Sequence, residues 1–97
     1  MPKISVLTSV YNESEKELLD CVDSILQQTF SDFEFILVND NPVREELDQM
    51  LADLSRKDRR IKVLKNPKNY GLAWSMNRAA AISRSPYLAR MDADDIS

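Results

Sequence analysis

Short apolar segments alternate along this chain with amphipathic segments, and this alternation restricts the fold more than any other feature. The strand-like segments cover residues 4–10, 33–38, 61–64 and 87–91. Each is too short for a typical helix and is rich in branched or aromatic side chains. Between them, apolar residues recur three or four positions apart, as on one face of a helix. The predicted order is therefore strand and helix three times, followed by a final strand.

Local residues mark where the three predicted helices begin and end. Ser14 and Glu17 have the spacing of a capping box at the start of the first helix. Pro42 suits a turn or a first helical position, and Pro86 prevents the third helix from continuing. The apolar helix faces consist of Leu18, Val22, Ile25 and Leu26, then Leu47, Met50, Leu51 and Leu54, then Leu72, Met76, Ala79 and Ala80.

This order predicts a single α/β domain over residues 1–97, a Rossmann-like three-layer sandwich with a mainly parallel sheet and right-handed crossovers. Such sheets bind ligands beyond the carboxyl ends of their strands. Polar residues follow three of the predicted strands at that edge: Tyr11 with Asn12, Asn39 with Asp40, and the aspartates between positions 92 and 95. We expect these three stretches to converge on one site.

Composition excludes several classes of function. The net charge is −3 and no long basic run is present, which argues against a nucleic-acid partner. The apolar runs are far too short to span a membrane, and no signal-peptide core follows Met1, so we expect a cytoplasmic location, with the full-length protein at most peripheral to the membrane. One cysteine and no histidine exclude an internal disulfide and an ordinary zinc site.

Glycine content separates this chain from the common phosphate-binding α/β folds. Dinucleotide-binding domains and P-loops need glycines in the first turn so that the backbone can approach a phosphate. Residues 10–14 here read Val-Tyr-Asn-Glu-Ser, and Gly71 is the only glycine of the chain. Any diphosphate must therefore be bound by other means.

The carboxylates Asp92, Asp94 and Asp95 follow the last predicted strand, residues 87–91, whose largely apolar pattern predicts a buried strand. Oxygen ligands in this position suit Mg²⁺ or Mn²⁺, with water and the oxygens of a diphosphate completing the coordination. An acidic cluster is more often a solvated loop, and that interpretation stays open on the residues alone. An EF-hand is excluded, because its glycine and its final glutamate are missing.

Four stretches in order, "SVLTSVYNE", "SILQQTFSDFEFILVNDN", "NPKNYGLAWSMNRA" and "YLARMDADD", resemble the amino-terminal half of the family 2 glycosyltransferases. The resemblance covers essentially the whole chain. It implies a GT-A fold that binds a nucleotide sugar, with Mn²⁺ or Mg²⁺ as cofactor. The residues it implies for nucleotide binding are Ser9, Tyr11, Asn12, Asp40, Asn69 and Asp92, and those for the metal are Asp94 and Asp95.

The sequence departs from the family at several positions. Residues 39–42 keep only the second of two usual aspartates and lack the serine that follows them, which affects the ribose and base contacts. Met76 stands where many relatives have an arginine, and we interpret it as a core residue; Arg78 lies on a different helix face and cannot take over that role. We expect Gly71 to permit a turn. Trp74 is interpreted as a buried packing residue, with a cover for the site as the alternative.

The resemblance implies inverting transfer of a sugar, with a UDP-sugar as the expected donor, to the hydroxyl of a saccharide or lipid-linked acceptor in polysaccharide or glycan synthesis. The catalytic base of the family lies beyond the position of Ser97, so this chain alone is expected to be inactive, and its uncovered sheet is expected to favour self-association. The alternative is a noncatalytic α/β module that binds a nucleotide or a metal.

Overall fold

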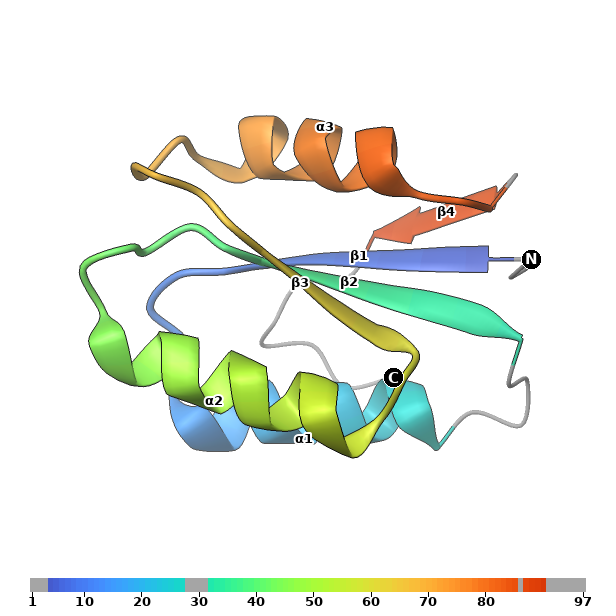
Figure 1. Ribbon diagram of the computed structural model, residues 1–97, viewed down its shortest axis with the longest axis horizontal. Helices are drawn as coiled ribbons and strands as arrows, with labels where there is room; N and C mark the ends of the chain where they lie inside the picture. The colour runs from blue at the N-terminus through green and yellow to red at the C-terminus, as the bar shows by residue number, and fades with distance from the viewer. Residues whose placement is uncertain (1–3, 28–31, 86, 91–97) are drawn as a thin grey trace.

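Parallel strands form one sheet in the computed structural model, which describes residues 4–27, 32–85 and 87–90 (Figure 1). Along the chain the elements are β1 (Ile4–Val10), α1 (Glu15–Leu26), β2 (Phe33–Asn39), α2 (Glu45–Lys57), β3 (Ile61–Lys65), α3 (Leu72–Ile82) and β4 (Tyr87–Arg90). The strand order is β3-β2-β1-β4, and each neighbouring pair is parallel. The predicted α/β order is confirmed, with β2 and β3 each one residue longer than expected.

Helices cover both faces of the sheet, as the predicted three-layer arrangement requires. Figure 1 shows α1 and α2 on one face and α3 on the other. Phe35 and Leu37 point to the larger core under α1 and α2, whereas Ile36 and Val38 point to a smaller core under α3. All seven residues of β2 are buried for this reason. A strand with two covered faces reads as a continuous apolar run rather than an alternating one.

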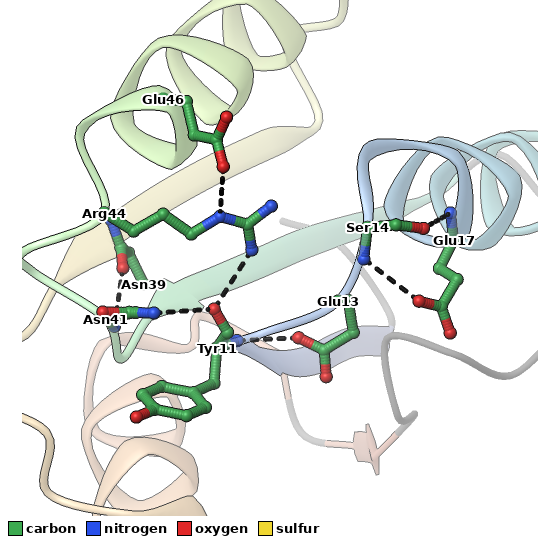
Figure 2. Close-up of polar contacts among 8 residues, drawn as sticks. All are labelled: Tyr11, Glu13, Ser14, Glu17, Asn39, Asn41, Arg44 and Glu46. Carbon is green, nitrogen blue, oxygen red and sulfur yellow. Dashed lines mark hydrogen bonds and ion pairs between the residues drawn. The ribbon is translucent and has the colours of Figure 1, made fainter.

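The capping prediction for α1 is confirmed, and the predicted inner faces of the helices are confirmed except at Leu72, which is 48% exposed. The Ser14 hydroxyl accepts a hydrogen bond from the Glu17 amide at 3.1 Å, and the Glu17 carboxylate accepts one from the Ser14 amide at 3.0 Å (Figure 2). Gly71 precedes α3 with φ of 89°, a conformation that favours glycine. Met76 is buried in the core under α3, as expected. None of the helices in the described residues has the length and apolar character needed to cross a bilayer.

Strand β4 departs from the expectation of a buried strand. Its four residues are all exposed, with Tyr87 at 70% and Leu88 at 50% exposure. The strand pairs only with β1 and so lies at the edge of the described sheet. An edge position leaves a strand with one neighbour, which explains why its apolar pattern alone was misleading. The predicted last residue of this strand, Met91, lies outside the described residues.

A buried carboxylate fixes the segment between α3 and β4 to the sheet. Glu34 on β2 is 2% exposed, and its Oε2 accepts hydrogen bonds of 2.6 Å from the Ser5 hydroxyl and from the Arg84 amide. The hydroxyl oxygens of Ser83 and Ser85 lie 2.5 and 2.9 Å from that of Ser5. The chain after α3 is therefore bound to β1 and β2 through polar side chains.

Replacing this carboxylate should give a pH-dependent loss of stability. Burial raises the pKa of Glu34, but hydrogen bonds from Ser5 and the Arg84 amide, with the positive charges of Arg84 and Lys62, outweigh it and hold the pKa below its ordinary value of 4.5. Stability from a lowered pKa is present above the ordinary value and is lost as the pH falls through the folded-state value. Glu34→Gln should therefore cost about 1–3 kcal/mol near pH 7, by analogy with other charged hydrogen bonds.

Urea unfolding between pH 7 and pH 3 measures this effect. The difference between wild type and Glu34→Gln should narrow as the pH falls below about 4.5. The exposed Glu45→Gln is the matched control and should change stability by less than about 0.5 kcal/mol. A difference that stays constant over the whole pH range would contradict the assignment.

Candidate functional site

The carboxyl ends of β1, β2 and β3 bring three polar segments side by side. Sheet pairing aligns Val10 with Asn39, and Asn39 with Lys65. The next amides continue this pattern: the Asp40 amide donates to the Val10 carbonyl at 2.9 Å, and the Asn66 amide donates to the Asn39 carbonyl at 2.9 Å. Residues just after the three strands therefore lie in one row at this edge, where ligands of parallel α/β sheets bind.

Asp40 holds the loop between β3 and α3. Asp40 is 3% exposed, and its Oδ1 accepts hydrogen bonds of 2.8 Å from the Asn66 side chain and from the Tyr70 amide. Its Oδ2 accepts one of 2.9 Å from the Gly71 amide. A carboxylate offers about four acceptor positions, so about one is not used by these three hydrogen bonds.

The local turn that an aspartate commonly makes after a strand is instead made by its neighbour. Asn39 Oδ1 accepts a hydrogen bond of 2.8 Å from the amide of Asn41, two residues later, which is the usual side-chain turn of Asn and Asp. The side-chain hydrogen bonds of Asp40 are instead long-range. Its partners lie 26 to 31 residues further along the chain.

Asn66 links this loop to α3. It is fully buried, and its side-chain amide donates to Asp40 and, at 2.9 Å, to the Ser75 hydroxyl. Its Oδ1 accepts a hydrogen bond from Arg78, which also donates to the Lys65 carbonyl at 3.2 Å. Sequence reasoning selected Asn69 in this loop and missed Asn66. The available indication was its position, because Asn66 follows β3 directly as Asp40 follows β2.

Tyr11 is held by its backbone at the end of β1 (Figure 2). Its carbonyl accepts hydrogen bonds of 3.1 Å from Asn41 Nδ2 and from Arg44 Nη1, and its amide donates to the Glu13 carboxylate at 2.7 Å. Arg44 in turn donates to the Glu46 carboxylate at 2.9 Å. The sequence contains no pattern that identifies Arg44, since its contact with Tyr11 spans 33 residues.

The other residues implied for nucleotide binding lie around this row or outside the described part. Ser9 is half-buried on β1, and Asn12 and Asn69 are exposed in the loops after β1 and β3. Asp92, Asp94 and Asp95 lie outside the described residues. Within residues 4–27, 32–85 and 87–90, no group of three or more acidic, cysteine or histidine side chains could hold a metal ion.

An aromatic pair joins the loop that Asp40 holds to the first turn of α3. The rings of Tyr70 and Trp74 have their centroids 4.8 Å apart at an interplanar angle of 43°. Trp74 remains 50% exposed, so its interpretation as a buried packing residue is wrong. Trp74 lies in the first turn of α3 but outside the inner face of the helix, which smaller residues such as Ala79 form.

Removing the Asn66 amide should destabilise the loop and α3 together. Asn66→Leu keeps the branching at Cγ but leaves the Ser75 hydroxyl and Arg78 without this partner, and leaves Asp40 with two of its three hydrogen bonds. Loss of buried partners should cost about 2–4 kcal/mol in the free energy of unfolding, measured by urea titration. The same change at Asn77, exposed on α3, is the matched control. Equal effects of the two substitutions would contradict a network centred on Asn66.

Solved structures share this fold. Staphylococcus aureus TarS (residues 1–349) matches with a TM-score of 0.81 and 27% identity, over 97% of this chain and 28% of that one. The mannosyltransferase PcManGT from Pyrobaculum calidifontis, solved in complex with GDP-Man and Mn²⁺, matches with a TM-score of 0.86 and 17% identity, over 98% and 28%. The GT-A type of α/β fold is therefore confirmed.

Sequence relatives give the family. An uncharacterized glycosyltransferase of Methanocaldococcus jannaschii is 43% identical over 96 residues, which are 99% of this chain and 33% of that protein. A bifunctional glycosyltransferase of Dictyostelium discoideum is 45% identical over 83 residues, covering 82% and 11%. This chain thus spans a third or less of the length of these relatives. Residues 5–97 match the glycosyl transferase family 2 pattern, and the chain belongs to that family.

Proposed function

We propose that residues 1–97 form the nucleotide-sugar-binding part of an enzyme that transfers a sugar from a nucleoside diphosphate to an acceptor hydroxyl. The observation that carries this proposal is the row of Tyr11, Asp40 and the Asp40-held loop at the carboxyl edge of the sheet. In a family 2 chain, we expect the nucleotide-sugar donor to bind at this edge of the sheet.

The described residues offer a nucleoside two kinds of contact. Tyr11 is 41% exposed and presents an aromatic ring next to the polar row, and Asp40 keeps about one acceptor position that could take a hydrogen bond from a base or a ribose. Ser9 and Asn12 flank Tyr11 on the same strand end, and Asn69 lies in the facing loop. We propose that these residues bind the nucleoside, with Asp92 contributing a ribose contact.

For the metal we propose Asp94 and Asp95, with Mn²⁺ or Mg²⁺ as the cofactor. Their carboxylate oxygens are the ligand type that these ions prefer, and the structural neighbour from P. calidifontis was solved with GDP-Man and Mn²⁺. A bound divalent ion would offset the charge that develops on the departing diphosphate. The resemblance favours UDP as the nucleotide. Because the P. calidifontis neighbour was solved with GDP-Man, GDP should be tested beside UDP.

Under this proposal, the catalytic base for the transfer is not among residues 1–97. An inverting transfer needs a carboxylate base to take the proton of the acceptor hydroxyl, and the family resemblance implies a base beyond the position of Ser97. Saccharides and lipid-linked saccharides are the expected acceptors, in polysaccharide or glycan synthesis.

Calorimetric titration of the full-length protein with UDP and GDP, with and without Mn²⁺, tests this proposal. We expect one nucleotide to bind in a metal-dependent way, and the double variant Asp94→Asn with Asp95→Asn to weaken that binding by at least about tenfold, since the metal loses its charged ligands. Asp23→Asn, an exposed carboxylate on α1, is the matched control and should bind as wild type.

The possible outcomes separate the parts of the proposal. Metal-independent binding that the double variant leaves unchanged would remove the metal assignment and keep the nucleotide site. A folded full-length protein that binds neither nucleotide would overturn the nucleotide site and favour a different α/β module. Transfer of the sugar with retained anomeric configuration, observed by NMR of the product, would contradict an inverting reaction.

A further inference from the structure

Two side chains between β2 and α2 hold the backbone carbonyl of Tyr11 (Figure 2). Asn41 Nδ2 and Arg44 Nη1 each donate to this oxygen at 3.1 Å. The preceding carbonyl, that of Val10, is the last one of β1 to accept an amide from β2, in this case that of Asp40. Tyr11 is therefore the first residue beyond the sheet, and side chains replace the backbone ladder in fixing its position.

Both donors are themselves held in place. Asn41 is 8% exposed, and its backbone amide donates a hydrogen bond to Asn39 Oδ1 at 2.8 Å. The Arg44 side chain is 16% exposed, and its Nε donates to Glu46 at 2.9 Å. Donors that are already ordered lose little conformational entropy when they hold a neighbour. The Tyr11 carbonyl thus meets a preformed pair of donors.

The ring of Tyr11 lies apart from these donors. Figure 2 shows the ring extending away from the Arg44 guanidinium, on the other side of the Tyr11 backbone. Arg44 and Asn41 donate to the carbonyl, and neither makes a hydrogen bond to the ring within the described residues. These donors can therefore act on the ring through the Tyr11 backbone.

Charge also argues against a direct role of Arg44 in binding a diphosphate. Its side chain is largely buried and is paired with the Glu46 carboxylate, so much of its charge is offset locally. A phosphate-binding arginine normally presents its planar fork to the ligand, whereas two nitrogens of this guanidinium are already bonded to groups of the protein.

We propose that Asn41 and Arg44 are positioning residues that fix the Tyr11 ring against the nucleobase of the donor, and so determine the affinity for the nucleoside part of the ligand. This inference rests on the proposed nucleotide site. It also gives a role to Asn41 in residues 39–42, where the chain departs from the family pattern: together with Arg44, two residues beyond this segment, Asn41 holds the neighbouring loop.

The test compares nucleoside and diphosphate binding by the full-length protein. The ligands are UDP or GDP, whichever the wild type binds, the matching nucleoside, and pyrophosphate with Mn²⁺, each measured by calorimetric titration. Arg44→Met keeps the apolar stem and removes the donors, and should weaken nucleotide and nucleoside binding about tenfold, the effect of one lost charged hydrogen bond. Pyrophosphate binding should stay within about twofold, and Arg44→Lys, which restores one donor, should recover part of the loss.

Two further variants keep the test decisive. Asn41→Ala should give the same nucleoside-selective loss, about fivefold for a neutral hydrogen bond, and serves if Arg44→Met folds poorly. Arg56→Met, at the opposite end of α2 and paired with Asp53, is the matched control and should bind all ligands as wild type.

Each outcome decides between the two proposals. Equal losses for nucleotide and pyrophosphate would show that Arg44 acts on the diphosphate by its charge, and would overturn the positioning role while leaving the nucleotide site. Wild-type affinities in both Arg44→Met and Asn41→Ala would likewise overturn it. Absence of nucleotide binding by the wild type would overturn the nucleotide site, and the positioning role with it.

Discussion

The burial of β2 on both of its faces is the constraint on which the rest of this structure depends. Alternate side chains of this strand enter the core under α1 and α2 and the core under α3. Its pairing with β1 and β3 then fixes which residues emerge together at the carboxyl edge. A shift of one residue would exchange the two faces and bring the polar residues of the edge into the cores, which makes this register costly to change.

The same strand positions α3 through two buried carboxylates. Glu34 and Asp40 lie near opposite ends of β2 and, six residues apart, on the same face of the sheet. Asp40 accepts hydrogen bonds from the loop before α3, and Glu34 accepts one from the segment after it. The core under α3 is the smaller of the two, so apolar packing alone stabilises this helix less. The polar contacts at both ends of α3 add to its stability.

This arrangement couples the stability of α3 to the geometry of the site. The Asp40 carboxylate that we propose as a nucleotide contact is also the acceptor that holds the backbone of Tyr70 and Gly71. Through Asn66, the same carboxylate is connected to Ser75 and Arg78 on the helix. On the other side of the row, the Tyr11 backbone is held from the α2 segment. The candidate site is thus built from contacts between the loops that follow β1, β2 and β3.

The sequence by itself determined the elements, their order, the capping of α1, the turn at Gly71 and the core position of Met76, because these features depend on local periodicity and backbone preference. It also indicated Tyr11 and Asp40 as edge residues, since the end of a strand can be read from its pattern. Only the tertiary structure decided the exposure of β4 and Trp74, and the partnerships of Asp40, Asn66 and Arg44. The physical reason is that burial, and hydrogen bonds between residues some 26 to 33 positions apart, depend on which segments pack together. Local sequence patterns do not determine this packing.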